Sequence, residues 1–219
     1  MKLSESEENH LKNIYNLQQN SSRVTTNSLA AVLNTSAASI TDMLKKLKAK
    51  KLLDYKKYYG FKLNTLGKTE ALKIIRKHRL WEYFLVSKLG MKWDKIHEIA
   101  EELEHVSSIE LIERLDNYLG HPKIDPHGDP IPDENGNMPI LNQISISQLA
   151  INKKAVVSSV SNQTIEMMEM LNYYGIQIGD SLTIIKSFEL DGSLLIKIAR
   201  KQEFVIGGLA AKNIFVYDN

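Results

Sequence analysis

Cysteine is absent from this chain of 219 residues, which excludes a disulfide framework, a cysteine-rich zinc module and a thiol nucleophile. Any metal site must therefore use histidine, carboxylate, amide, thioether or water ligands. The sequence also lacks a run of about 18 apolar residues, so no transmembrane helix is expected. Its first segment, MKLSESEENH, lacks the apolar core of a signal peptide, and the expected compartment is the cytoplasm.

Net charge is low as well, at +2, but it is unevenly distributed along the chain. Residues 1–69 carry 12 basic and 5 acidic side chains, a net charge of +7. The remaining 16 basic and 21 acidic side chains give residues 70–219 a net charge of −5. A basic front end on an acidic remainder is typical of a polyanion-binding unit attached to a part with another role.

The spacing of apolar residues predicts three helices in the basic part, at about residues 3–17, 27–33 and 37–50. A hairpin is predicted over residues 52–63, because two β-prone runs flank a tip that includes Gly60. Three helices followed by a hairpin make a winged helix-turn-helix. Such a unit inserts the second helix of its helix-turn-helix motif into the major groove of DNA.

The acidic part contains two different patterns. Helices are expected at about residues 66–89, 91–105 and 109–119, and this all-helical middle is large enough for a dimer contact. The prolines gather in residues 120–143, which form either a long ordered loop or a linker. A small SH3-like β-barrel with one helical piece at 164–172 is expected beyond them, so the fold class is mainly α with β. Its β-prone runs are 155–160, 181–188, 193–197, 203–206 and 214–217, with turns at 191–192 and 207–208.

Residues 97–105 carry imidazoles and carboxylates at helical spacing. Residues three and four positions apart share a helix face. Four side chains therefore point the same way: His97, Glu101, Glu104 and His105. His78 and Glu82 are also one turn apart, on the preceding helix. Because imidazole and carboxylate suit first-row divalent metals, these two helices predict a metal site, with a solvated charged face as the alternative.

Motifs of common enzyme classes are missing. His97 and Glu98 are followed at the required spacing by Glu101 instead of histidine, so the zinc-protease pattern HExxH fails. No GxSxG motif and no phosphate-binding loop is present, and we expect that the chain is not an enzyme. Asp125 and His127 in the proline-rich segment are a weaker metal candidate, because a histidine there can equally belong to a capped loop.

Four motifs together resemble the diphtheria-toxin-repressor family of metalloregulators, and within it the manganese-transport regulators with a C-terminal SH3-like (FeoA-type) domain. The motifs are ENHLKNIY at 8–15, RKHRLWE at 76–82, IHEIAEELEH at 96–105 and PHG at 126–128. The resemblance spans nearly the full chain and implies three domains. These are a DNA-binding winged helix-turn-helix at 1–69, a helical metal-binding and dimerisation domain at 70–143, and an SH3-like domain at 144–219.

The resemblance implies a primary, activating metal site. Asn9 is a departure, since manganese-sensing relatives place aspartate there and iron-sensing relatives place methionine. Lys12 replaces an acidic residue of the two-domain manganese regulators, which argues against their two-metal cluster. Glu101 stands where iron-type members have cysteine, so the oxygen and nitrogen donors favour Mn²⁺, with Fe²⁺ as the alternative and other divalent metals expected to bind in vitro. The implied ligands are Asn9, His78, Glu101, Glu104 and His105.

A second, ancillary metal site is implied by relatives that keep the third domain. Its C-terminal carboxylate aligns best with Glu166, while Glu169 is one turn away. The implied set is Glu82, Asp125, His127 and Glu166, with His97 as an additional candidate.

The recognition helix also resembles that of the family. Its small residues allow close approach and contact with thymine methyl groups, while serine and threonine can bond phosphates or base edges. The implied DNA-facing residues are Ser36, Ala37, Ala38, Ser39, Thr41 and Asp42. The lysines expected to neutralise phosphates are Lys45, Lys46, Lys56 and Lys57.

These observations predict a Mn²⁺-dependent transcriptional repressor that binds double-stranded operator DNA as a homodimer when metal-loaded. The resemblance implies that it controls metal-ion uptake genes. No membrane and no small organic substrate are expected among its partners. One alternative is an iron-dependent repressor of the same family. Another is a winged-helix regulator of a non-metal ligand, in which the His/Glu cluster is structural. A metallohydrolase is the third, although no general base or oxyanion arrangement is apparent.

Overall fold

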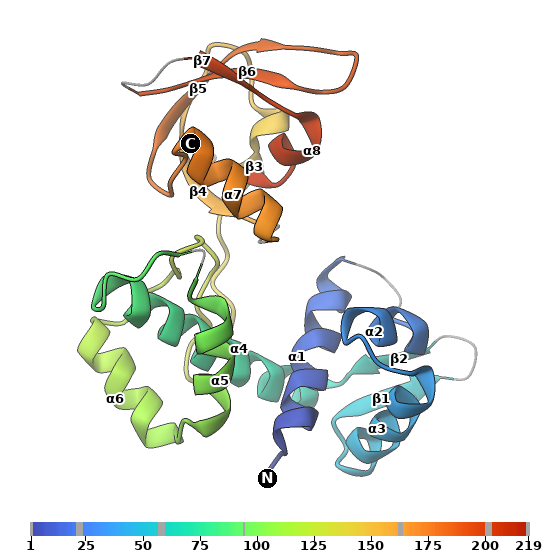
Figure 1. Ribbon diagram of the computed structural model, residues 1–219. Helices are drawn as coiled ribbons and strands as arrows, with labels where there is room; N and C mark the ends of the chain where they lie inside the picture. The colour runs from blue at the N-terminus through green and yellow to red at the C-terminus, as the bar shows by residue number, and fades with distance from the viewer. Residues whose placement is uncertain are drawn as a thin grey trace. The chain divides into compact units, whose positions relative to one another are not determined.

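The computed structural model describes residues 2–20, 24–56, 60–93, 95–161, 164–199 and 203–217 (Figure 1). The chain divides into two compact units, each with its own hydrophobic core. The first unit contains Met1–Trp81, Ala100–His121 and Ile131–Pro139. The second contains Glu82–Ile99, Pro122–Pro130 and Ile140–Asn219. None of the helices in the described part of the chain has the length and apolar content needed to span a bilayer.

The first unit begins with the predicted winged helix-turn-helix. Its elements are α1 (Glu5–Asn20), α2 (Thr26–Val32), α3 (Ala37–Ala49), β1 (Leu53–Lys56) and β2 (Gly60–Leu63). The two strands are antiparallel, with Leu53 opposite Leu63. Side-chain caps begin the helices: Thr25 accepts from the backbone N–H of Ser28 at α2, and Ser36 caps α3. One core joins these elements and includes Leu11, Ile14, Leu29, Ile40, Leu47 and Phe61.

A long helix, α4 (Thr65–Ser87), follows the hairpin directly. Asn64 caps it, because its side-chain oxygen accepts from the backbone N–H of Gly67 at 3.0 Å. At Gly67 the helix passes close to the chain before the hairpin, since a Cβ there would lie 1.9 Å from the Leu52 carbonyl oxygen. This close packing gives the start of α4 a defined place against the winged helix.

Two shorter helices, α5 (His97–Val106) and α6 (Ile109–Leu119), complete the helical part. The prediction for residues 109–119 is confirmed, but helix over 91–96 is wrong, since α5 begins only at His97. The end of α4 gives the reason: Gly90 adopts a positive φ of 64°, and the N–H of Met91 bonds back to the carbonyl of Leu85 at 3.1 Å. This C-cap turns the chain out of helical geometry.

The proline-rich segment is an ordered loop, one of the two alternatives left open by the sequence. In the second unit, Asp125 Oδ1 accepts from the backbone N–H groups of His127 and Asp129. Gly128 follows with a φ of +84°, and a Cβ there would lie 1.8 Å from the Ser158 carbonyl oxygen. In the first unit, the Asp133 side chain accepts backbone bonds in the same manner.

The second unit is built around a six-stranded sheet, in which every paired neighbour is antiparallel. The strand order is β3-β8-β4-β5-β6-β7. Leu182 and Ile184 lie opposite Ile198 and Ile196, and all four are buried, which is the period of two expected of a half-buried sheet. Its elements are β3 (Gln143–Ser145), the 3-10 turn η1 (Ile146–Gln148), β4 (Lys154–Val160), α7 (Ile165–Tyr174), β5 (Ser181–Ser187), β6 (Leu194–Ile198), β7 (Glu203–Ile206), α8 (Gly208–Ala211) and β8 (Ile214–Tyr217).

Two elements of this unit differ from the sequence prediction. β3 was not expected, and the predicted turn at 207–208 opens the one-turn helix α8. Gly208 permits this helix, because a Cβ there would lie 2.3 Å from the Asp191 carbonyl oxygen. Both elements depend on long-range packing that a local sequence pattern does not contain.

Candidate metal centre

Three helices of the first unit bring the predicted primary ligands together. Glu101, Glu104 and His105 on α5 each offer a ligand atom, and these atoms lie within 4.8 Å of one another. His78 on α4 has its Nδ1 2.6 Å from Glu104 Oε2, and Glu104 is fully buried. Asn9 on α1 places its Oδ1 2.8 Å from His105 Nε2. All five side chains therefore belong to one connected polar cluster.

Lys12 lies at the centre of this cluster. Its ammonium is 2.6 Å from Glu101 Oε2 and 2.6 Å from Glu104 Oε1, and its side chain is 10% exposed. Two carboxylates that face each other at a buried position repel unless a cation stands between them. The Lys12 ammonium thus places a positive charge where the predicted ligands converge. The sequence analysis did not predict this contact.

Glu8 is a second residue that the sequence analysis left out of the site. Its Oε2 lies 2.7 Å from His105 Nδ1, so its negative charge favours a proton on that nitrogen. The other nitrogen, Nε2, then faces Asn9 and, at 3.4 Å, Glu104 Oε1. A carboxylate behind the imidazole is the usual partner of a metal-binding histidine. The spacing rule applied to α5 also places Glu8 on the same face of α1 as Lys12, but it does not show that this face meets α5.

The first turn of α1 is anchored to α3. The Ser4 N–H donates to Glu7 Oε2 at 2.8 Å, the Glu7 N–H donates to Ser4 Oγ, and Lys50 donates to Glu7 Oε2 at 2.7 Å. Burial acts to raise the pKa of Glu7, but the bonds from Lys50 and Ser4 outweigh it and leave this pKa below its ordinary value. The helix that carries Asn9 is therefore fixed to the C-terminal end of α3.

A second cluster, in the second unit, consists of Glu82, Asp125 and His127, whose ligand atoms lie within 4.8 Å of one another. All three side chains are buried, at 2%, 3% and 2% exposure. His127 Nε2 lies 3.1 Å from the Trp93 carbonyl oxygen, to which it can donate. Within the described part of the chain, His127 Nδ1 has no hydrogen-bond partner, and it lies 3.9 Å from Glu82 Oε2.

This second arrangement fits a cation. With its proton on Nε2, His127 directs a lone pair from Nδ1 toward the carboxylate of Glu82, so two acceptors face each other. A buried polar atom without a partner is costly, and a metal ion beside Nδ1 would satisfy this nitrogen. His97 lies at the edge of the cluster, because its Nδ1 is 3.5 Å from Glu82 Oε1 and its side chain is 66% exposed.

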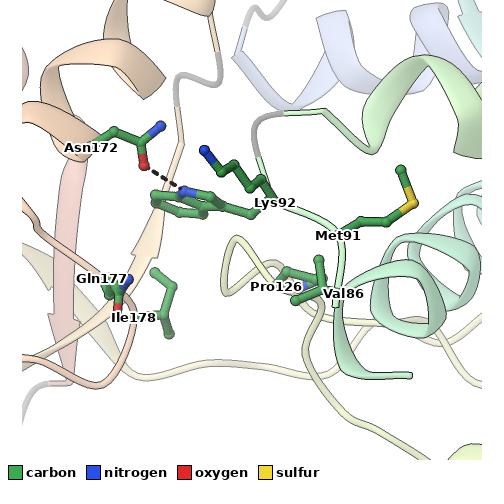
Figure 2. A pocket seen from close by; sticks show the side chains of 8 residues that line it. Val86, Met91, Lys92, Pro126, Asn172, Gln177 and Ile178 are labelled. Atoms are coloured by element: carbon green, nitrogen blue, oxygen red, sulfur yellow. Dashed lines mark hydrogen bonds between the residues drawn. The ribbon is translucent and has the colours of Figure 1, made fainter. Parts of the chain in front are cut away.

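Glu166 is not brought into this cluster. It lies exposed in the first turn of α7, outside every metal-ligand group found among the described residues, so its ligand role stays a prediction. Trp93 instead connects α7 to the cluster. Its ring stacks on His127 with centroids 5.6 Å apart, and its Nε1 donates to Asn172 Oδ1 at 3.0 Å. Figure 2 shows this bond beside a pocket of about 570 Å³.

The predicted DNA-facing residues are exposed and lie at the N-cap and in the first two turns of α3. Two of them bond within the helix: Thr41 donates to the Ala37 carbonyl oxygen, and Ser36 accepts from the backbone N–H of Ser39. Asp42 accepts from Lys45 at 2.9 Å, and this bond lowers the pKa of its carboxyl group. The six exposed residues are Ser36, Ala37, Ala38, Ser39, Thr41 and Asp42, with Lys45 and Lys46 beside them. Lys57 and the side chain of Lys56 lie outside the described residues.

Comparison with known proteins identifies this arrangement. Residues 2–61 match the N-terminal DNA-binding domain of iron-dependent repressors, and residues 64–133 match their metal-binding and dimerisation domain. Residues 144–218 match the FeoA domain. The chain belongs to the iron-dependent repressor family. It is thus a member of a family of metal-dependent transcriptional repressors, and the resemblance inferred from its motifs is confirmed, as is its fold class.

Relatives of this repressor family match over most of the chain. A solved manganese-dependent transcriptional repressor in complex with manganese is 31% identical, with a TM-score of 0.87 over 97% of this chain and 100% of that one. An uncharacterised HTH-type transcriptional regulator of Methanocaldococcus jannaschii is 36% identical over 118 residues, 53% of this chain and 94% of that protein. The iron-dependent repressor IdeR of Mycobacterium leprae is 31% identical over 130 residues, 59% of this chain and 56% of that protein.

Proposed function

We propose that this repressor is activated by Mn²⁺ and binds operator DNA as a homodimer. In this proposal residues 1–69 read DNA, residues 70–143 bind metal and dimerise, residues 144–219 are the SH3-like domain, and the regulated genes serve metal-ion uptake. The observation that carries it is the convergence of Asn9 from α1 with Glu101, Glu104 and His105 from α5, because the ligands then come from both the DNA-reading part and the helical part.

The coupling to DNA runs through α1. Its buried Leu11 and Ile14 pack in the same core as Ile40 and Leu47 of α3, so a change in α1 is transmitted to the recognition helix. A bound divalent cation supplies the positive charge that the converging carboxylates and imidazoles require. Asn9 and Glu8 hold α1 against His105 in that state, and an ion that prefers this docked state shifts the population toward it.

Manganese is favoured by the donor set. The five proposed ligands offer carboxylate, amide and imidazole groups, and the chain has no thiolate. These harder donors suit Mn²⁺, although the order of intrinsic affinities favours later metals. The similar solved repressor is manganese-dependent and the similar mycobacterial repressor is iron-dependent, so Fe²⁺ is the second candidate.

Dimerisation is supported by apolar side chains that the first unit leaves exposed around α5 and α6. Val106 is 79% exposed, Ile109 75% and Tyr118 67%. Several large, exposed apolar side chains on two consecutive helices favour a protein interface there more than a single one would. A two-fold dimer then requires two half-sites about one helical turn, or a multiple of it, apart on DNA.

A DNA-binding measurement tests this proposal. A duplex selected from a random library in the presence of Mn²⁺ is titrated at fixed salt with Mn²⁺, with Fe²⁺ under anaerobic conditions, and with chelator. We expect about tenfold or more tighter binding with Mn²⁺ than with chelator, as is typical of allosteric coupling. His105→Ala should abolish this difference, while His121→Ala, at a 59% exposed histidine of the same unit, should keep it. Equal affinity in all three conditions would overturn the proposal.

We further propose that Glu82, Asp125 and His127 bind a second ion, with His97 at its edge and Glu166 as an additional ligand. The buried Nδ1 of His127 supports this site. Elemental analysis of the Mn²⁺-loaded protein should give two ions per chain, and one in His127→Ala. A variant that keeps two ions would contradict the second site, and Glu166→Gln tests the additional ligand separately.

A further inference from the structure

The primary cluster contains a cation of its own. The Lys12 ammonium contacts Glu101 Oε2 and Glu104 Oε1, each at 2.6 Å. The second oxygen of Glu104 is also engaged, because His78 Nδ1 lies 2.6 Å from Glu104 Oε2. Both oxygens of the most buried carboxylate are therefore used in this arrangement.

Lys12 stabilises a pair of charges that would otherwise be unfavourable. Glu104 is fully buried and Glu101 is 34% exposed at its side chain, and both approach the same ammonium. Removing a cation from such a site leaves two carboxylates that repel each other in a region of low dielectric constant. A metal ion that takes these carboxylates as ligands must compete with Lys12 for the same two oxygen atoms.

We propose that Lys12 is a tethered competitor of the activating metal, whose ammonium holds Glu101 and Glu104 in the metal-free chain and leaves when the metal binds. The inference rests on the proposed function of this site. Because Lys12 is attached to α1, its local concentration at the carboxylates is high and fixed. It therefore sets the free metal concentration at which the repressor switches.

The position of Lys12 also links this exchange to α1. Asn9 and Lys12 are three residues apart and share a helix face, and both reach α5. Two sets of contacts join α1 to α5: the Lys12 ammonium with Glu101 and Glu104, and Glu8 and Asn9 with His105. In this proposal metal binding releases the first link and keeps the second.

The first test replaces Lys12 with methionine, which keeps an unbranched stem and removes the charge. Titration with MnCl₂ against a fluorescent chelator should show about tenfold or more tighter binding than in the wild type, because one positive charge next to the ion is lost. The metal-free variant should melt at a lower temperature, and Mn²⁺ should raise its melting temperature by more than in the wild type. Lys73→Met, at an exposed lysine of α4, is the matched control and should change neither quantity.

Unchanged or weaker Mn²⁺ binding in Lys12→Met would overturn the inference. If the wild type itself binds no Mn²⁺, the proposed function fails instead, so the two failures are distinguishable.

The second test uses the wild-type chain and does not depend on the folding of a variant. Amine acetylation followed by mass spectrometry should find Lys12 protected without metal and modified several-fold faster with MnCl₂, since the ammonium has left the carboxylates. Lys73 serves as the internal reference, with the same rate in both conditions. Equal or greater protection of Lys12 in the presence of Mn²⁺ would contradict its release.

Discussion

His105 illustrates how single contacts determine the chemistry of this site. Both of its ring nitrogens face oxygen atoms, Glu8 Oε2 at 2.7 Å and Asn9 Oδ1 at 2.8 Å. A neutral imidazole donates from only one nitrogen, so the proton that Glu8 favours on Nδ1 leaves a lone pair on Nε2. In the proposed metal site this lone pair would bind the ion.

Glu8→Gln is expected to weaken Mn²⁺ binding about 10- to 100-fold, the usual cost of losing the carboxylate behind a ligating histidine. The glutamine keeps the size of the side chain but removes the charge that orients His105. Isothermal titration calorimetry with MnCl₂ measures the effect. Glu5→Gln, at an exposed glutamate in the same turn, is the control and should bind as the wild type does. If both variants bind equally well, Glu8 does not orient the imidazole.

At the scale of an element, α1 depends on its first turn. Ser4 and Glu7 exchange backbone-to-side-chain bonds, and Lys50 at the end of α3 completes the arrangement. The same helix carries the residues that face the metal centre. Its position is therefore coupled to the ionisation of one buried carboxylate.

Glu7→Gln should lower the free energy of unfolding by about 0.5–1 kcal/mol near neutral pH, because the ion pair with Lys50 is lost. The folded-state pKa of Glu7 lies below its ordinary value of 4.5, so its charged form stabilises the fold. This contribution is present above pH 4.5 and disappears as the pH falls through the folded-state pKa. Urea unfolding at several pH values should give two curves that converge in acid, and a pH-independent difference would refute the assignment.

The loop that carries Asp125 and His127 depends on one glycine. Gly128 combines a positive φ with a Cβ position 1.8 Å from the Ser158 carbonyl oxygen, so any side chain strains the backbone and meets β4. Local geometry at this position therefore decides whether the second cluster assembles.

Gly128→Ala should destabilise the second unit by about 2 kcal/mol or more and displace His127 from Glu82. Gly179→Ala is the control for backbone strain alone, because Gly179 also has a positive φ but no atom lies within 4 Å of its Cβ position. Thermal melting and metal stoichiometry measure the two effects. Equal melting temperatures of the two variants would show that the contact with Ser158 is unimportant.

At the scale of the whole molecule, the residues that the structure describes form two hydrophobic cores. One includes Leu11, Leu29 and Leu47 of the first unit, and the other includes Leu171 and Ile196 of the second. The primary cluster draws only on the first unit and the cluster around His127 only on the second. Each site is therefore linked to the stability of a different unit.

Leu171→Ala should lower one thermal transition and leave the other unchanged, while Leu47→Ala should do the reverse. Both side chains are fully buried, and such truncations cost about 2–5 kcal/mol. Differential scanning calorimetry resolves the transitions, and Mn²⁺ should raise the transition lowered by Leu47→Ala, to which the primary site belongs. A single transition shifted by both variants would mean that the units unfold together.

The sequence by itself determined the local features of this protein. Apolar periodicity predicted α6 and the β7 and β8 strands to the residue, because helix and strand patterns repeat within a few positions. The same rule placed Glu101, Glu104 and His105 on one face of α5. The charge difference between residues 1–69 and the remainder already indicated a polyanion-binding part at the front of the chain.

Only the tertiary structure decided what those faces meet. Lys12 is 89 residues from Glu101, and Glu8 is 97 residues from His105, so no local period brings them together. Helix packing does so, because the buried apolar face of α1 leaves Glu8, Asn9 and Lys12 directed at α5. The burial of His127 Nδ1 likewise depends on the turn at Gly128, where a positive φ and the close approach to Ser158 require glycine. Periodicity describes positions within one helix or strand. The place of the Lys12 ammonium between Glu101 and Glu104 depends instead on which helices pack against each other.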